Sequence, residues 1–174
     1  MRRIQKKVCL LGDFAVGKTS LVQRFVYNRF SDKYLSTIGV KVSRKTVVVP
    51  EGDEVVEVTM MLWDLAGSQD FEGVRANYLR GATGALLVCD MTRPETLSGL
   101  ERYFHDLQEV SAHAVTLLVA NKSDLTNQLR FSAAQVEQMA AAHDTQAYLT
   151  SAKTGANVEE VFRRLGQLLL EHSQ

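Results

Sequence analysis

Cysteine is scarce in this 174-residue sequence, its charge is balanced, and long apolar runs are missing. The only cysteines, Cys9 and Cys89, each lie inside a short apolar run, so a disulfide framework is excluded and a reducing cytoplasm is the expected location. Twenty basic and twenty acidic residues cancel to a net charge of zero, which offers no overall attraction to nucleic acid or to an anionic membrane. No apolar stretch approaches the ~20 residues of a membrane-spanning helix.

The two ends of the chain carry none of the usual lipid-attachment signals. Met1 is followed by arginine instead of the glycine that myristoylation needs, and residues 171–174 contain no cysteine for prenylation. We therefore expect no lipid anchor in this chain. Its length is that of one domain, expected to span residues 1–174 as a monomer. A small basic cluster is interpreted as a solvated segment ahead of the first strand: Arg2, Arg3, Lys6 and Lys7.

Short apolar runs alternate with amphipathic stretches along the chain. Strands joined by helices in this order indicate a six-stranded, mostly parallel α/β sheet with one antiparallel hairpin strand and helices on both faces. In such sheets, ligands bind beyond the carboxyl ends of the strands. The predicted strands are residues 8–11, 40–49, 55–63, 85–89, 115–120 and 147–150, with a turn at 50–53. The predicted helices are residues 18–27, 74–80, a segment from Pro94 to about Leu107, a segment after Ser132, and 158–169.

Residues 12–19 match the phosphate-binding signature G-x-x-x-x-G-K-[ST], and they lie between a predicted strand and a predicted helix, as that signature requires. The glycines allow backbone N–H groups to turn toward phosphate oxygens, and the helix N-terminus adds its partial positive charge. We expect Lys18 to reach the β- and γ-phosphates and the Thr19 hydroxyl to ligate Mg²⁺. A strand-turn-helix with chance glycines is the alternative, expected in fewer than about one chain in a hundred. The predicted phosphate contacts are Ala15, Val16, Gly17, Lys18, Thr19 and Ser20.

A second motif, Asn121-Lys122-Ser123-Asp124, follows directly on an apolar strand. A carboxylate at Asp124 can accept two parallel hydrogen bonds from N1–H and the exocyclic amine of guanine, whereas adenine offers no such pair of donors. The wrong base would leave the carboxylate buried and unpaired, so the discrimination should be large. The stem of Lys122 can lie over the ring face. For the tetrapeptide taken alone, the alternative is an ordinary Asn/Asp turn. A phosphate-binding loop earlier in the same chain disfavours this alternative.

These motifs, with Thr37-Ile38-Gly39, residues 64–67 (Asp-Leu-Ala-Gly) and Ser151-Ala152-Lys153, make the chain resemble the Ras superfamily of small GTPases, which are P-loop NTPases. The resemblance runs over essentially the whole chain. Residues 38–46 and 78–82 look most like the Rab branch. Lys41 and Val42 depart from it, since an Asp-Phe pair is usual there.

The resemblance implies further roles. Phe30 should pack against the guanine edge, with Asn121, Lys122, Ser151 and Lys153 around the base and the backbone N–H of Ala152 on the base oxygen. Thr37 should join Thr19 and Asp64 around Mg²⁺, and both Thr37 and the Gly67 N–H should touch the γ-phosphate. Hydrolysis removes that phosphate and frees two loops, residues 29–39 and 65–75. Effectors, an exchange factor and a GTPase-activating protein would bind these loops.

Two residues depart from the family pattern. Most relatives carry glutamine directly after Asp-x-x-Gly, where it orients the attacking water, but this chain has Ser68 there and Gln69 one position later. The serine hydroxyl is too short to span the same gap, so we expect slow unaided hydrolysis of GTP. Phe14 puts a bulky ring in the phosphate loop, where it could crowd a partner's arginine or simply cover apolar surface. The candidate catalytic residues are Lys18, Thr37, Gly67, Ser68 and Gln69.

Three functions remain open at this stage. The chain is expected to be a GTP/GDP-dependent switch with Mg²⁺, and a module that holds GTP permanently as a scaffold is the first alternative, favoured by Ser68 and Phe14. A general P-loop ATPase or nucleotide kinase is disfavoured by Asp124 and by the lack of an arginine-rich lid segment. Rab relatives usually continue into a tail ending in cysteine, so either such a tail has been removed or the protein works in solution. The four histidines show no ligand spacing and are expected on helix surfaces or helix ends: His105, His113, His143 and His172.

Overall fold

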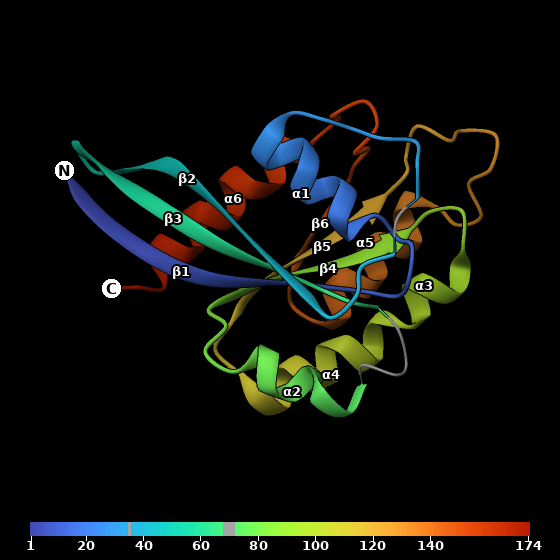
Figure 1. Cartoon of the computed structure of the whole chain (residues 1–174), viewed down its shortest axis with the longest axis horizontal. Helices are drawn as coiled ribbons and strands as arrows, with labels where there is room; N and C mark the ends of the chain where they lie inside the picture. Colours follow the sequence, from blue (N-terminus) through green and yellow to red (C-terminus); the bar gives the residue numbers. More distant parts are fainter. Residues whose placement is uncertain (35, 68–71) are drawn as a thin grey trace.

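The computed structural model describes residues 1–34, 36–67 and 72–174, and of residues 72–74 only the backbone. Within these residues, a six-stranded sheet with strand order β2-β3-β1-β4-β5-β6 forms the centre of the molecule (Figure 1). The strands are β1 (Arg2–Leu11), β2 (Val40–Glu51), β3 (Glu54–Leu65), β4 (Gly84–Asp90), β5 (Val115–Asn121) and β6 (Gln146–Leu149). The helices are α1 (Lys18–Tyr27), α2 (Glu72–Leu79), α3 (Pro94–Ser98), α4 (Leu100–Val110), α5 (Ala133–Ala142) and α6 (Val158–Glu171).

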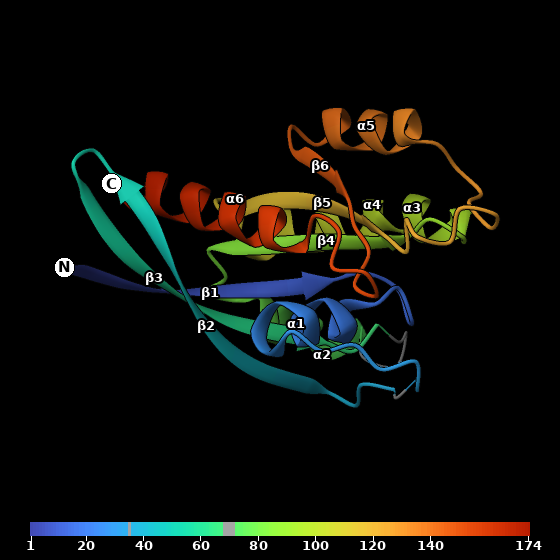
Figure 2. The same cartoon turned by 90° about the horizontal axis from the view of Figure 1, so that it is seen from above.

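The pairing of the strands confirms the predicted sheet. Strand β1 lies between β3 and β4 and is parallel to both, and β5 is parallel to β4 and β6. Of the six strands that the structure describes, only β2 runs antiparallel, as the hairpin partner of β3. The ends of the parallel strands therefore meet at one edge, where Asp90 pairs with Asn121 across β4 and β5. Figure 2 shows the loops that follow β1, β4 and β5 gathered at this edge, on the right of the view.

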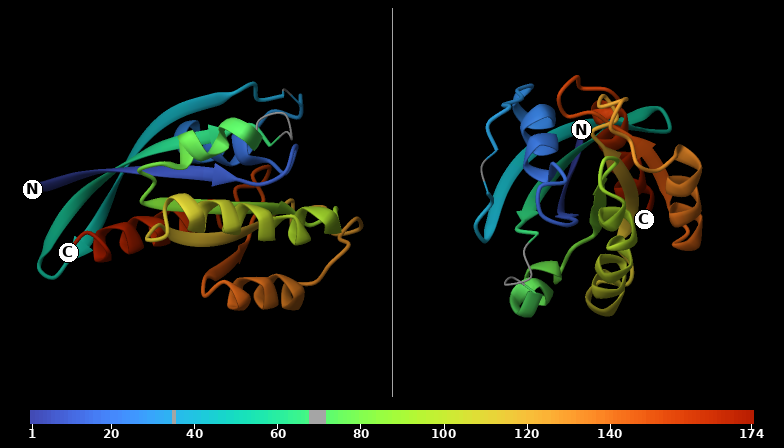
Figure 3. Two further views of the ribbon diagram at one scale, coloured as in Figure 1. Left: turned by 90° about the horizontal axis from the view of Figure 1, so that it is seen from below. Right: turned by 90° about the vertical axis from the view of Figure 1, so that its right-hand side faces the viewer.

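Helices cover both faces of the sheet, as predicted (Figure 3). One apolar cluster joins α1 and α6 to the sheet and includes the stacked rings of Phe25 and Phe162, whose centroids lie 3.8 Å apart. The other cluster joins α2, α3, α4 and α5 to the opposite face and includes Tyr103 and Phe104. Two layers of helices around a sheet leave the strand ends as the place where loops from different elements can converge.

Arg2 and Arg3 are exposed, as expected for a solvated segment, but they belong to the first strand, so the prediction that the basic cluster precedes the strand was wrong. Strand β1 begins at Arg2, and its parallel register with β3 starts where Arg2 pairs with Val56. A long partner strand offers backbone hydrogen bonds that outweigh the weak local preference of charged residues for strands. The arginines also find acidic partners, since Arg2 lies 3.1 Å from Glu51 and Arg3 lies 2.6 Å from Glu57.

The single helix predicted from Pro94 is two helices, α3 and α4, that meet at Gly99. A Cβ atom at Gly99 would lie 2.8 Å from the Asp13 carboxylate and 2.9 Å from the Glu95 carbonyl. The Asp13 carboxylate is the end of a side chain that can turn aside, whereas the Glu95 carbonyl is backbone of α3, so the helix itself leaves little space for a side chain at position 99. The predicted apolar stripe is nevertheless buried as expected: Leu97, Leu100, Phe104 and Leu107.

The predicted cap of α5 and the predicted placement of the histidines are confirmed. Ser132 caps α5 in a reciprocal capping box with Gln135. The histidines lie on helix surfaces or near helix ends, and His143 and His172 directly follow α5 and α6. In the described part of the chain, three or more His, Cys, Asp or Glu side chains never gather closely enough to hold a metal ion by themselves. Among the same residues, every helix is too short or too polar to span a membrane.

Candidate nucleotide-binding site

The phosphate-binding loop connects the end of β1 at Leu11 to the start of α1 at Lys18. Gly17, the residue that precedes the helix, has a backbone φ of 103°, a conformation that residues with a side chain rarely adopt. A Cβ at this position would lie 2.3 Å from Nδ2 of Asn121. Only glycine satisfies both conditions, and its absence of a side chain brings the loop directly against the strand that carries the second motif.

Lys18 lies across this loop. Its amino group donates to the carbonyls of Gly12 at 2.7 Å and Asp13 at 3.0 Å. The side chain is buried, and burial lowers the pKa of the amino group to about 8, although the nearby Asp64 and Asp13 carboxylates oppose the shift. A buried cation with strong donors at the mouth of a phosphate-binding loop can attract and orient phosphoryl oxygens.

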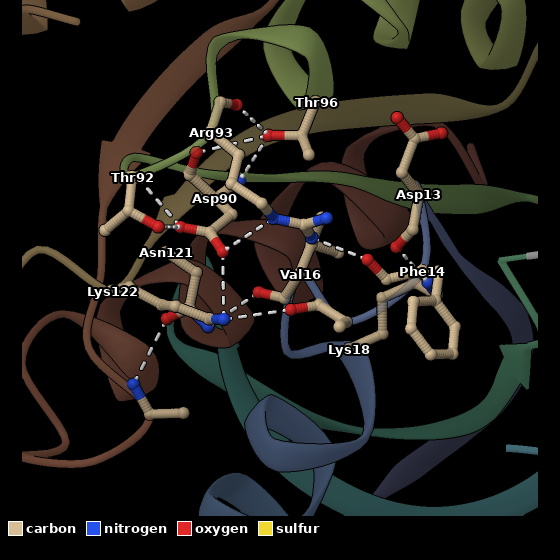
Figure 4. Close-up of polar contacts among 12 residues, drawn as sticks. Asp13, Phe14, Val16, Lys18, Asp90, Thr92, Arg93, Thr96, Asn121 and Lys122 are labelled. Carbon is tan, nitrogen blue, oxygen red and sulfur yellow. Dashed lines mark hydrogen bonds and ion pairs between the residues drawn. The ribbon is translucent and has the colours of Figure 1, made fainter. Parts of the chain in front are cut away.

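Three carbonyls of the loop are held by side chains from other strands and their loops (Figure 4). Asn121 Nδ2 donates to Val16 at 3.1 Å, Lys122 Nζ to Ala15 at 2.9 Å, and Arg93 Nη2 to Phe14 at 2.5 Å. Holding the carbonyls from outside leaves the loop free to present N–H groups to an anion, as such loops do. The loop and the Asn-Lys-Ser-Asp motif are therefore joined directly by hydrogen bonds.

The Asp124 carboxylate is positioned by a neighbouring loop. Oδ1 of Asp124 accepts a hydrogen bond from the Ser151 hydroxyl at 2.8 Å, and Ser151 itself accepts from the Thr154 N–H at 3.0 Å. Asn121 Oδ1 accepts from the Ala152 N–H at 3.2 Å. These contacts bring two of the predicted base-binding segments together, residues 121–124 and 151–153.

The predicted metal ligands also converge. The Thr19 hydroxyl lies 2.7 Å from the Thr37 hydroxyl and donates to Oδ2 of Asp64 at 2.5 Å. Asp64 is 2% exposed, and its other oxygen, Oδ1, is buried without a hydrogen-bond partner among the described residues. Burial raises the pKa of this carboxyl against the effect of the Thr19 hydrogen bond. Hard oxygen donors with an unsatisfied buried carboxylate oxygen fit Mg²⁺, which favours oxygen ligands and keeps several waters.

Comparison with known proteins decides the family. A sequence model of the Ras family matches residues 7–171. The chain belongs to the Ras family. It is 34% identical to the GTP-binding protein ypt4 of Schizosaccharomyces pombe over 158 aligned residues, which make up 90% of this chain and 68% of that protein. It is 34% identical over 165 residues to the Ras-related protein Rab-13 of Rattus norvegicus (94% and 79%) and 39% identical over 157 residues to RABA1h of Arabidopsis thaliana (90% and 70%).

These relatives confirm the resemblance to Rab-like small GTPases, and the sheet confirms the P-loop NTPase fold of the Ras family. Some predicted site residues make none of the contacts described above between the phosphate-binding loop, residues 121–124 and residues 151–153. Phe30 packs against the buried cluster that holds Ala152, and Ser20 lies in the first turn of α1. Lys153 is exposed, and its carbonyl accepts a hydrogen bond from Arg24. Ser68 and Gln69 lie outside the described residues.

Gly67 lies against the phosphate-binding loop. A Cβ there would be 2.6 Å from the carbonyl oxygen of Gly12 and from the backbone nitrogen of Phe14. Two motifs more than fifty residues apart therefore meet backbone to backbone. This contact is compatible with the expected role of the Gly67 N–H at the γ-phosphate.

Sequence reasoning missed the residues that hold the motifs together. Asp90 is 1% exposed, lies 2.9 Å from the Lys122 amino group and accepts hydrogen bonds from Thr92. Burial alone would raise the pKa of its carboxyl, but the hydrogen bonds from Lys122 and Thr92 together hold it below the usual value. The position of Asp90 at the carboxyl end of an apolar strand, visible in the sequence, could have identified it as a site residue. Arg24 donates to the Ala152 carbonyl at 2.9 Å, and no sequence pattern indicated this role.

Proposed function

We propose that the chain is a guanine-nucleotide-dependent molecular switch, which binds GTP or GDP with Mg²⁺ and hydrolyses GTP slowly. The observation that carries the proposal is the connection between Asp124 and the phosphate-binding loop. Ser151 holds the Asp124 carboxylate, while Asn121 and Lys122 of the same motif hold the loop at Val16 and Ala15. A ligand with a base at one end and phosphates at the other fits this arrangement.

The base specificity follows from the charge of Asp124. Guanine presents N1–H and an exocyclic amine side by side, and a carboxylate accepts from both. Adenine would place a ring nitrogen without a proton opposite that carboxylate and leave it unpaired. The same motif therefore selects guanine and anchors the phosphate loop.

Thr19, Thr37 and Asp64 would hold Mg²⁺. The bound ion supplies positive charge that offsets the charge of the phosphates. The chain adds the Lys18 ammonium, buried beside the loop and bonded to its carbonyls. These groups act by position and charge, because phosphoryl transfer leaves little covalent chemistry for the protein to perform.

The switch rests on residues that join two loops to the phosphate end of the site. Thr37 belongs to the 29–39 loop and contacts Thr19. Gly67 lies against Gly12, between the end of β3 at Leu65 and the start of α2 at Glu72, so the loop predicted over 65–75 is shorter than expected. If each also contacts the γ-phosphate, its removal releases both loops, and effectors, an exchange factor and an activating protein can read the difference. Because Ser68 replaces the usual glutamine, we expect unaided hydrolysis at or below the rate of about 10⁻⁴ s⁻¹ that is typical of Ras.

A scaffold that holds GTP without useful turnover is the second candidate. The half-exposed ring of Phe14 at the phosphate loop favours it, because a bulky group there can hinder an activating partner. The nucleotide extracted from the purified protein separates the two functions. GDP supports turnover, and GTP alone supports the scaffold.

Nucleotide competition tests the binding proposal itself. Labelled GDP bound in the presence of Mg²⁺ should be displaced by unlabelled GDP and GTP, while ADP and ATP at the same concentrations should leave it bound. Equal displacement by ADP would contradict guanine recognition and favour a general P-loop ATPase or nucleotide kinase.

A further inference from the structure

Phe14 and Tyr34 make an aromatic contact between the phosphate-binding loop and the loop that follows α1. Their ring centroids lie 5.3 Å apart and the ring planes meet at 74°, an edge-to-face arrangement. This geometry is favourable because the positive edge of one ring meets the negative face of the other. Phe14 is 49% exposed and Tyr34 56% exposed, so the pair lies at the surface and its rings are not forced together by the packing of the core.

Phe14 is a firm support for this contact. Its carbonyl accepts from Arg93, whose guanidinium also pairs with the buried Asp90 carboxylate at 3.2 Å. On one side, the Asp13 carboxylate accepts a hydrogen bond from the Tyr103 hydroxyl at 3.0 Å; on the other, the Ala15 carbonyl is held by Lys122. Residues 13–15 are therefore held by α4, by the loop after β4 and by Lys122, which directly follows β5.

Tyr34, in contrast, belongs to a loop without regular structure. Contacts on either side of it join the loop to the domain: Phe30 packs against the core, and the Thr37 hydroxyl lies 2.7 Å from that of Thr19. Tyr34 lies between these two points in the sequence, where the loop passes the phosphate-binding loop. Its contact with Phe14 therefore joins the loop to the phosphate-binding loop at a point between Phe30 and Thr37.

We propose that Phe14 and Tyr34 form an aromatic latch, which holds the 29–34 segment against the phosphate-binding loop and slows the release of the bound guanine nucleotide. The inference rests on the proposed function, since it assumes that this site holds the nucleotide. The nucleotide leaves after the loop opens, and opening separates the two rings. The favourable energy of the ring pair then adds to the barrier for release. Both residues act by positioning the loop.

The rate of release from protein loaded with N-methylanthraniloyl-GDP and Mg²⁺, chased with excess unlabelled GDP, tests the latch. Phe14→Leu and Tyr34→Leu should each accelerate release by roughly 2- to 10-fold, the range expected for one aromatic pair. The double variant should release no faster than the faster single variant, because the second substitution removes a contact already lost. Phe14→Tyr and Tyr34→Phe keep both rings and should retain the original rate.

Tyr27→Leu is the matched control. Tyr27 is also 49% exposed and ends α1, but its ring packs under Arg29, with the guanidinium carbon 4.8 Å from the centroid. It should release nucleotide at the original rate. Equal acceleration by Tyr27→Leu, multiplication of the single effects in the double variant, or unchanged rates in both single variants would overturn the latch. Failure of the unsubstituted chain to bind labelled GDP in an equilibrium titration would instead refute the proposed function itself.

Discussion

The amino group of Lys122 lies 2.9 Å from the carboxylate of Asp90, at the point where β4 and β5 end side by side. Lys122 also donates to the Ala15 carbonyl, so the ion pair supports both the base-reading motif and the phosphate-binding loop. The relative position of the two motifs therefore depends on one buried carboxylate, that of Asp90.

Replacement of Asp90 should therefore weaken the whole domain. Asp90→Asn removes the charge from a site that is 1% exposed and leaves the Lys122 and Arg93 cations without their shared partner. We expect a loss of about 2 kcal/mol in the free energy of unfolding, less than for a fully buried pair because Lys122 is one-third exposed. Urea unfolding measures the loss, and Asp53→Asn, in the exposed β2–β3 turn, is the control. An unchanged midpoint for Asp90→Asn would contradict this role.

The same pair predicts a pH dependence. The pKa of Asp90 is lower in the folded chain than the ordinary value of 3.8, so its ionised form stabilises the fold above that pH. This contribution is lost as the pH falls below 3.8 and through the depressed folded pKa. The difference in unfolding free energy between the unsubstituted chain and Asp90→Asn should therefore shrink over this acidic range. A difference that stays constant down to pH 2 would argue against the ionised pair as its source.

The two cysteines should be unreactive in the folded protein. Cys9 and Cys89 are buried, and burial raises the pKa of each thiol to about 12. Since the thiolate is the reactive form, a disulfide-exchange reagent at pH 8 should label neither residue until urea unfolds the chain. Rapid labelling of one thiol per chain without denaturant would contradict the described burial.

Helix α2 should depend on Arg75 for its attachment to α4. Arg75 is 2% exposed, pairs with Asp106 on α4 at 2.5 Å and lies over the Tyr103 ring, 4.6 Å from its centroid. Arg75→Gln should cost about 2–3 kcal/mol of stability, because it removes a buried charge from its partner and leaves space behind. Backbone hydrogen exchange in residues 75–79 should be faster in Arg75→Gln than in Arg80→Gln, the control at an exposed position. Equal protection in the two variants would contradict the role of Arg75 as an anchor.

Metal affinity should depend on Thr19. Its hydroxyl lies between the Thr37 hydroxyl and the Asp64 carboxylate, so Thr19→Ala removes one ligand and the group that positions two others. We expect at least about tenfold weaker Mg²⁺ binding to the GDP-loaded protein, measured as the Mg²⁺ concentration that slows GDP release. The neighbouring Ser20→Ala should have a much smaller effect on metal affinity. An unchanged Mg²⁺ requirement in Thr19→Ala would place the metal elsewhere.

Local sequence patterns located the motifs and most of the elements, but they missed the division between α3 and α4, the start of β1, and the contacts between elements. The apolar runs at 85–89 and 115–120 identified strands because both faces of each are covered by helices. The extension of β1 through Arg2 was not visible in the sequence, since it depends on a partner strand whose paired residues lie 54 positions later, as Arg2 and Val56 do. The hydrogen bonds of Tyr103 to Asp13 and of Arg24 to Ala152 join residues 90 and 128 positions apart, and no local pattern announces them.

The nucleotide preference of the Asp124→Asn variant tests the central claim most directly. Xanthine differs from guanine in carrying a carbonyl in place of the exocyclic amine, which an asparagine amide can pair with and a carboxylate cannot. The account predicts that the variant loses GDP affinity by at least about 100-fold and prefers xanthosine diphosphate, whereas the unsubstituted chain prefers GDP. An unchanged preference for GDP in the variant would contradict guanine recognition by Asp124.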